Sequence, residues 1–454
     1  MVGLICTLFA IYFYWEASKR YFSFFLVLFL VTGGFQLVPV EHMELPILGI
    51  TKTYDWALVY SIALIVITPQ VFVNYTLWSR INEVKVFLLV LLFLASYSLI
   101  YIGVELQVTI RVLRNYLFLI LLFPFLRLPK LDYEKTLRLV VYFSSIAAFL
   151  YCLQPFLGRT ILNGAPVEES VESVGLIRFY NLPFFVIPTI FLLFNRNSDL
   201  NIKYPNTLLI INLLAIVLSQ HRNLLLTLIC CYFIHLLISN RVKLKNLLIY
   251  GVISIVFFTG VDTYFNNRFS EGLLELMQPS NEVTPYYLYT VSSSDISTTE
   301  FRRLHFLERF YFAQEKIETS LFGLGFLTED SRIVNQLSFN IGLTNEYGEI
   351  AQISTADIAW SIFVVHFGLL GTLALLYFFV SYASKFYSLR KESFCRAGFL
   401  YIVALFLTSF YGVDIILPHT LSLLMFFVSY WYCVSYQVEK IETNVGYKNM
   451  KFYM

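Results

Sequence analysis

Long apolar segments alternate with short polar connections along most of this chain. A helix that crosses a bilayer needs roughly 17–25 apolar residues, and ten uncharged runs have that character: 21–40, 56–79, 86–104, 139–158, 179–195, 204–220, 223–240, 358–384, 397–413 and 415–438. Three weaker runs lie at 2–15, 110–126 and 246–261. The pattern predicts an all-α, polytopic integral membrane protein with about 12–14 transmembrane helices.

The composition supports a membrane protein and excludes a soluble enzyme of this size. Hydrophobic residues make up 58% of the 454 residues and charged residues 14%. Soluble domains contain roughly 45–50% apolar and roughly 25% charged residues. The net charge of +2 gives no reason to expect nucleic acid as a partner.

The distribution of lysine and arginine predicts the orientation. If the N-terminus is outside and every run crosses the bilayer, one side receives 20 of the 32 basic residues and 8 of the 30 acidic ones. Basic loops stay in the cytoplasm, so the C-terminus is expected inside. The chain then divides into an N-terminal bundle of about ten spans (1–261), a large extracytoplasmic loop (262–356) and C-terminal helices with a cytoplasmic tail (357–454).

The large outer loop is predicted to be partly helical. Residues Ser297–Glu300 have the spacing of a capping box, and apolar residues follow at helical intervals. Gly323 and Gly325 would end this helix. We expect an amphipathic helix over about 298–320, packed on the outer membrane face, and a mobile stretch over 278–297.

Several arginines are expected on the outer side, against the positive-inside tendency. Arg178 closes the smaller outer loop, and Arg222 lies between two closely spaced apolar runs. Each side chain could extend to the lipid headgroups or serve as a fixed cation for phosphate. Both interpretations stay open on sequence grounds.

Three other ionisable residues lie in or next to apolar runs. Asp357 begins the run after the large loop, where it could favour the helix dipole or face the outer arginines. His235 and His366 lie inside apolar runs, where a histidine is either functional or bridges two helices.

Outer-face arginines beside a large outer loop suit an anionic lipid headgroup such as a polyprenyl pyrophosphate. Arginine would hold the pyrophosphate, and a carboxylate or histidine could accept a proton from a sugar hydroxyl. No glycine-rich phosphate loop follows a strand pattern, and an activated sugar on a lipid needs none. We therefore expect no cofactor.

Four short stretches resemble the O-antigen polymerase and O-antigen ligase superfamily of bacterial inner membranes. Gly175–Tyr180 is similar to its Arg-Phe element, and Leu218–Arg222 to its Leu-Ser-x-x-Arg element. Phe322–Phe326 resembles its Gly-x-Gly turn, and Asp357 with Phe367–Gly371 resembles the span that returns from the loop. The likeness is strongest over about 175–375. A proline-asparagine pair after the Arg-Phe element is absent, and Asp357 stands where ligases tend to carry a histidine motif, which favours a polymerase.

The resemblance implies transfer of a growing glycan from its polyprenyl pyrophosphate carrier to the next lipid-linked repeat unit, without a metal. In this hypothesis Arg178 and Arg222 bind the pyrophosphates, and Arg302 or Arg303 adds a contact. Asp357 orients or deprotonates the acceptor hydroxyl, although Glu300 is another candidate base. The partners are lipid-linked oligosaccharides and the bilayer, and a chain-length regulator protein stays open.

Three alternatives remain. A ligase would transfer the finished glycan to another lipid acceptor. A flippase or transporter would move the lipid-linked unit, but such proteins usually show internal repeats, and none is found. A membrane glycosyltransferase with a long, acidic first outer loop is the third, but residues 41–55 form a short loop here.

Overall fold

Each apolar run that the structure describes contains a helix. The computed structural model describes residues 1–46, 50–69, 81–164, 171–173, 176–194, 200–239, 260, 298–344, 350–353, 355 and 357–450. The N-terminal elements are α1 (Val2–Trp15), α2 (Arg20–Val31), α3 (Val40–Met43), α4 (Asp55–Ile67), α6 (Asn82–Tyr97), α7 (Leu106–Arg114), α8 (Leu122–Phe125) and α9 (Lys130–Leu157). A π-helical turn, η3 (Ser98–Ile102), extends α6, and a 3₁₀ helix, η4 (Asn115–Leu121), joins α7 to α8.

The second half of the chain is also helical. A small antiparallel hairpin, β1 (Val171–Ser173) and β2 (Leu176–Arg178), pairs Val171 with Arg178. The helices that follow are α10 (Val186–Leu193), α11 (Pro205–Leu218), α12 (Arg222–Ile238), α16 (Thr298–Gln314), α17 (Ile317–Phe322), α18 (Ala359–Ser388), α19 (Ser393–Thr408) and α20 (Pro418–Met450). Two 3₁₀ turns, η6 (Arg332–Gln336) and η7 (Asp414–Ile416), lie between them. The expected helical class is confirmed.

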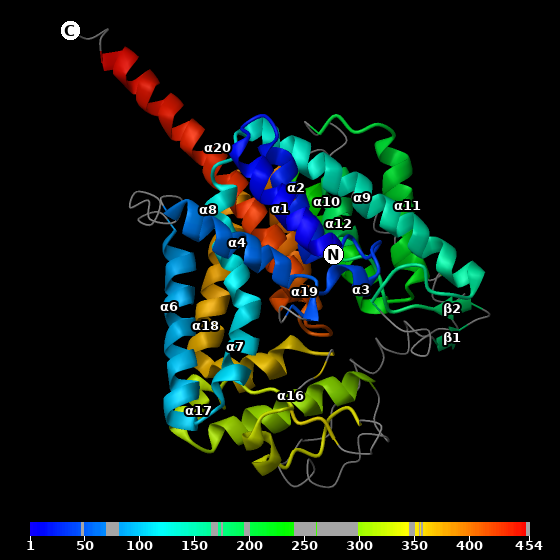
Figure 1. Ribbon diagram of the computed structural model, residues 1–454, viewed down its shortest axis with the longest axis vertical. Helices are drawn as coiled ribbons and strands as arrows, with labels where there is room; N and C mark the ends of the chain where they lie inside the picture. The colour runs from blue at the N-terminus through cyan, green and yellow to red at the C-terminus, as the bar shows by residue number, and fades with distance from the viewer. Residues whose placement is uncertain are drawn as a thin grey trace.

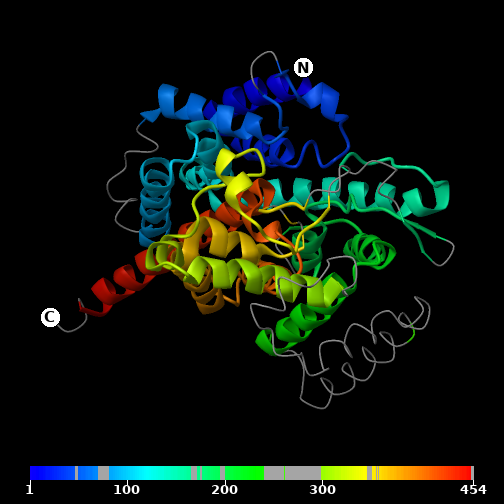
Figure 2. The same cartoon turned by 90° about the horizontal axis from the view of Figure 1, so that it is seen from below.

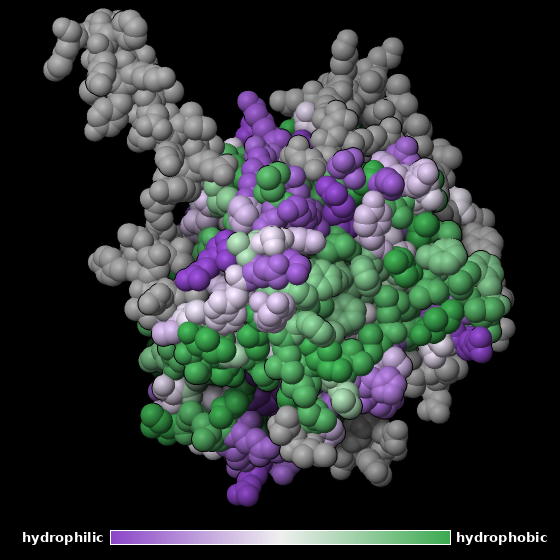
Figure 3. Space-filling model, turned by 45° about the horizontal axis from the view of Figure 1, so that its top comes forward, coloured by the Kyte–Doolittle hydropathy of each residue, from purple (hydrophilic) through white to green (hydrophobic). Residues whose placement is uncertain are grey.

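Four helical segments are long and apolar enough to cross a membrane: Asn82–Ile102, Leu106–Phe125, Lys130–Leu157 and Ala359–Ser388. Six shorter apolar helices lie among the described residues: α1, α2, α4, α11, α12 and α19. On the face shown in Figure 3, hydrophobic residues form a broad band between more hydrophilic ends. A membrane protein is therefore supported, and the larger number of spans stays a prediction.

Two of the predicted spans are shorter than expected. The run 21–40 leaves the helix after Val31, because residues Gly33–Gln36 all have positive φ. The run 179–195 becomes helical only at Val186, since the preceding residues are held by side-chain hydrogen bonds described below. Apolar composition alone predicts neither the early end of α2 nor the late start of α10.

Aromatic side chains fill the core between the helices. Phe87 of α6 lies 5.6 Å from Phe378 of α18, between ring centroids. Phe426 of α20 lies within 5.2 Å of Phe125 and Tyr133. These large side chains join elements that are distant in sequence, and edge-to-face ring pairs stabilise packing beyond the area that they bury.

The described part of the large loop covers one end of the helices. Helices α16 and α17 lie at the end opposite to the C-terminal end of α20 (Figure 1). Seen from below, α16 runs across the ends of the other helices (Figure 2). The predicted helix 298–320 is confirmed as two pieces, since Lys316 is extended and Thr319 Oγ1 donates to the carbonyl of Ala313 at 2.7 Å. Ser297 of the expected capping box and the stretch 278–297 lie outside the described residues.

Candidate functional site

Arg178 and His221 form the first half of the site. Arg178 ends β2, and its Nη2 lies 3.2 Å from Nδ1 of His221, just before α12. The guanidinium also stacks over the ring of Tyr180, 4.6 Å from the ring centroid. A cation held by both a ring face and a histidine has its direction fixed.

A buried amide network positions the segment that carries Arg178. Gln154 Nε2 donates to Asn181 Oδ1 at 3.0 Å, and Asn181 Nδ2 donates to the carbonyl of Leu162 at 2.6 Å. Tyr151 donates to the carbonyl of Phe179 at 2.8 Å. Buried polar groups are costly unless they are paired, so this network anchors the segment before α10 to the bundle and delays the start of α10.

Arg222 is the first residue of α12 and directly follows His221. The turn before it contains Gln220 at a φ of +54°, and the Ser219 hydroxyl accepts the His221 amide at 3.4 Å. Arg222 is half-buried. The predicted tight connection is therefore present, and it places Arg222 at the end of α12 that carries the site.

Arg302 and Asp357 form the second half. Arg302 on α16 lies 3.4 Å from Asp357 Oδ1, measured from Nη2, just before α18. The Asp357 amide donates to Thr355 Oγ1 at 3.0 Å. The large loop and the returning helix are thus joined at two residues that the sequence singled out.

The two halves meet at His221. Its pKa is lowered to about 4, first by burial and then by the positive charges of Arg178 and Arg302. Both guanidinium groups therefore lie near one imidazole. His221 is neutral at physiological pH, and because Arg178 can only donate, Nδ1 accepts and Nε2 carries the proton.

The remaining predicted residues lie elsewhere. Arg303 forms an ion pair with Glu300 on its own helix at 3.1 Å. His366 Nε2 lies 2.8 Å from the carbonyl of Leu327, which supports a bridging role in α18. His235 on α12 packs against Phe194, 5.4 Å between ring centroids.

Sequence reasoning missed His221 and Tyr180 as site residues. Both stand inside the stretches that were quoted for Arg178 and Arg222. Each stands within two residues of an arginine that the sequence singled out, but only the fold shows that His221 faces Arg178.

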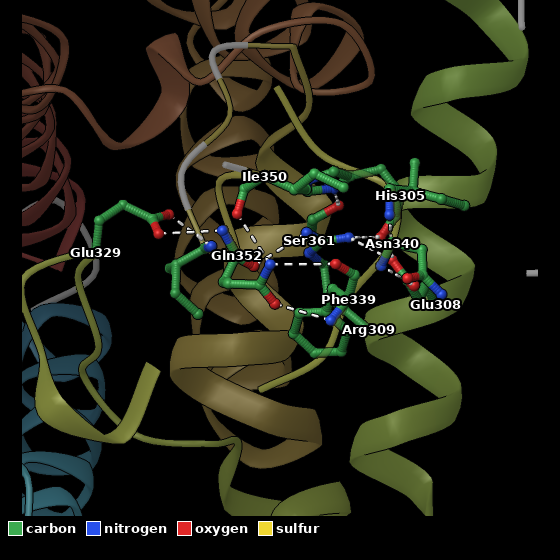
Figure 4. Close-up of polar contacts among 11 residues, drawn as sticks. His305, Glu308, Arg309, Glu329, Phe339, Asn340, Ile350, Gln352 and Ser361 are labelled. Carbon is green, nitrogen blue, oxygen red and sulfur yellow. Dashed lines mark hydrogen bonds and ion pairs between the residues drawn. The ribbon is translucent and has the colours of Figure 1, made fainter. Parts of the chain in front are cut away.

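A buried polar network holds the loop that delivers Arg302. Arg309 is fully buried and donates to Glu308 and to the carbonyl of Gln352, at 3.1 and 3.0 Å (Figure 4). Burial lowers the pKa of Arg309 to about 10, which leaves it charged at neutral pH. Glu308 in turn accepts the amides of Asn340 and Ile341 at 2.7 and 3.2 Å.

The same network fastens the loop to α18. His305 Nδ1 lies 2.8 Å from the Ser361 hydroxyl (Figure 4). Glu329 accepts the amides of Gln352 and Ile353 at 3.0 and 2.6 Å. Arg302 lies on the same helix as His305, so these contacts fix its approach to Asp357.

A glycine contact joins two of the stretches that carry the family resemblance. Helix α18 breaks at Gly368, with φ of 54° and ψ of −157°, and the amide of Leu324 donates to the carbonyl of Val365 at 2.6 Å. A Cβ on Gly323 would lie 2.5 Å from that carbonyl oxygen, and one on Gly368 would lie 2.4 Å from the Gly323 amide. Only glycine allows this approach.

No model of a known protein family matches the chain, and no curated protein matches it. The resemblance to the polymerase and ligase superfamily therefore stays an expectation from the four sequence stretches and their order.

Chemically, the site presents fixed cations, a neutral histidine and a carboxylate. Arginine binds phosphate through paired N–H groups, and the His221 Nε2–H group can donate to an oxygen. Among the described residues, no group of three or more histidine, cysteine or acidic side chains is placed to hold a metal ion. The arrangement suits an anionic group next to a leaving or attacking oxygen.

Proposed function

We propose that this protein polymerises oligosaccharide repeat units carried on polyprenyl pyrophosphate, at the outer face of the bacterial inner membrane. The growing chain leaves its pyrophosphate carrier and joins the terminal sugar of the next lipid-linked unit. Such a reaction builds O-antigen, capsule or exopolysaccharide. The protein crosses the membrane many times, with its N-terminus outside and its C-terminus in the cytoplasm.

One observation carries this proposal: Arg178 Nη2 lies 3.2 Å from His221 Nδ1, and the charge of Arg302, from a separate segment, lowers the pKa of the same histidine. Cations delivered from two loops to one half-buried histidine favour an anionic headgroup over a neutral ligand. The position of α16 across one end of the apolar helices suits a ligand whose lipid tail stays in the bilayer.

The residues take distinct roles in this proposal. Arg178, Arg222 and Arg302 bind pyrophosphate oxygens and stabilise the charge that develops as the carrier leaves. His221 donates from Nε2 to one of these oxygens. Asp357 is paired with Arg302. This pairing supports a role in orienting the acceptor hydroxyl more than a role in accepting its proton. Arg303 stays a secondary candidate.

A ligase is the second candidate function, because the same site would serve any transfer from a polyprenyl pyrophosphate. The observation that keeps it open is His221, a histidine in the site. A flippase is less favoured, since Glu308 and Arg309 join α16 to Asn340, Ile341 and Gln352 of the loop, whereas a transporter must open alternately to both sides.

The test is reconstitution of the purified full-length protein in liposomes. The added substrate is the lipid-linked glycan extracted from a strain that lacks the gene. We expect glycans of two or more repeat units on the carrier lipid. Extension that requires a second lipid acceptor would indicate a ligase, and movement of single units across the bilayer without new glycosidic bonds would contradict the proposal.

Arg222→Lys tests the phosphate clamp in the same assay. Lysine keeps the charge but loses the paired N–H geometry. We expect about tenfold to 100-fold slower extension, which corresponds to the loss of one charge-assisted hydrogen bond. Full activity of Arg222→Lys would show that Arg222 does not bind the pyrophosphate through paired N–H groups.

A further inference from the structure

Asp414 is a carboxylate that the site described above does not use. It begins η7, the turn between α19 and α20, and the next two residues, Ile415 and Ile416, are buried. Asp414 itself is exposed. No hydrogen-bond donor or cation contacts its carboxylate in the part of the chain that the structure describes.

The position of Asp414 is recessed although it is open to water. Burial raises the pKa of its carboxyl, and no neighbouring charge contributes to the shift. An exposed carboxylate on an open surface would not be desolvated in this way. The side chain of Asp414 is thus partly desolvated by the residues around the turn and still reaches solvent.

The turn that carries Asp414 contacts the elements of the proposed site. Tyr411 donates to the carbonyl of Asn223 at 2.8 Å, two residues after His221. The amide of Ala359, two residues after Asp357, donates to the carbonyl of Ser409 at 3.0 Å. Both halves of the site are therefore joined to the segment Ser409–Asp414.

A third contact joins the turn to the segment after Arg178. The ring of His419, at the start of α20, stacks on Phe184 with a centroid distance of 4.2 Å. Phe184 and Tyr180 stay 40% and 42% exposed. Both rings therefore keep part of their surface open on the segment that the turn contacts, and the C–H face of a sugar ring could pack there while a nearby carboxylate accepts from its hydroxyls.

The two carboxylates of this region differ in their availability. Asp357 is paired with Arg302, and a carboxylate that is bound to a cation is a poorer base. Asp414 has no such partner among the described residues. A general base needs a free lone pair within reach of the acceptor hydroxyl.

We propose that Asp414 is the catalytic residue that accepts the proton of the acceptor sugar hydroxyl. This inference rests on the proposed polymerase function. As the O–H bond breaks, its proton moves to Asp414 and the acceptor oxygen bonds to the anomeric carbon of the donor. The bond from that carbon to the pyrophosphate breaks, and its electron pair leaves with the carrier, which the arginines bind.

The test compares Asp414→Asn with Asp414→Glu in the liposome assay, using lipid-linked glycan extracted from the deletion strain. Asparagine keeps the shape but cannot accept the proton. We expect the rate of extension to fall about 100-fold or more in Asp414→Asn, with partial activity in Asp414→Glu. Asp330→Asn is the matched control, because Asp330 is an outer carboxylate paired with Arg111, and it should extend glycans at the wild-type rate.

The outcomes separate this inference from the function on which it rests. Wild-type extension with an unchanged rate in Asp414→Asn would overturn the role of Asp414 and leave the polymerase proposal standing. The absence of extension by the wild-type protein would overturn both. If Asp414→Asn does not fold, a wild-type rate in folded Asp414→Glu and Asp414→Ser would still contradict the inference.

Discussion

Arg178 shows how one side chain is fixed by chemically different neighbours. It stacks on Tyr180, faces His221 and belongs to a segment that the Asn181 amide anchors. The sequence predicted an outer arginine at this position. It could not predict the partners, because His221 lies 43 residues away and is brought close only by the fold.

Arg178→Lys should lower activity without preventing folding. Lysine cannot stack its charge on Tyr180 and donate to His221 with the same fixed geometry. We expect about tenfold to 100-fold slower glycan extension, the effect of one lost charge-assisted hydrogen bond. Arg111→Lys, at the exposed ion pair with Asp330, is the control and should leave the rate unchanged. Equal rates for both variants would argue against a direct role for Arg178.

His305 should make attachment of the loop sensitive to acid. Its pKa is lowered to about 2, first by burial and then by Arg309, whereas an unfolded histidine has a pKa of about 6.5. As the pH falls below about 6.5, His305 therefore binds a proton in the unfolded chain but stays neutral in the folded chain. This stability is complete above about pH 6.5 and is lost progressively toward about pH 2.

The measurement is the unfolding temperature between about pH 6.5 and 5, above the usual range of carboxylate titration. We expect a smaller fall for His305→Asn than for the wild-type protein, since asparagine takes up no proton. Identical pH profiles would show that His305 does not contribute to the pH dependence.

At the scale of elements, apolar length predicted where helices occur better than where they end. Helix α9 and the two-part loop helix lie near their predicted positions. The early end of α2 and the late start of α10 depend on left-handed residues and on amide side chains that bond to distant backbone groups. Such bonds have no periodic pattern in the sequence, so they could not be predicted from it.

The contact between Gly323 and Gly368 should be intolerant of any side chain. Gly368→Ala would place a Cβ against the backbone of Gly323 at a strained φ. We expect a loss of roughly 1–3 kcal/mol in the free energy of unfolding from strain alone, with a further loss from the clash. Gly103→Ala is the control, since Gly103 has a φ of +82° but no atom within 4 Å of its Cβ. Chemical denaturation should show the larger loss at Gly368, and equal losses would contradict a close-packed contact.

At the scale of the whole molecule, the loop helix α16 and the C-terminal end of α20 lie at opposite ends (Figure 1). The distribution of lysine and arginine predicts that the loop end faces outward. The described structure contains four segments able to span the membrane.

Site-directed labelling tests this orientation in intact cells. Arg332→Cys introduces a thiol at a side chain that is 93% exposed on the loop, and Lys391→Cys introduces one in the exposed turn between α18 and α19. We expect a membrane-impermeant maleimide to label Arg332→Cys directly and Lys391→Cys only after permeabilisation. The unmodified protein measures background from the six native cysteines, and the reverse labelling pattern would contradict the predicted orientation.

In the proposed function, the arginines and His221 serve polymerisation of lipid-linked glycan. The most direct measurement is the glycan profile of cells in which the gene is deleted and restored as wild type or as Arg178→Ala. We predict long glycan ladders with the wild-type gene and single repeat units on the surface with the deletion and with Arg178→Ala. Long chains that accumulate on the carrier lipid, single units trapped in the cytoplasmic leaflet, or an unchanged ladder in the deletion strain would contradict this account.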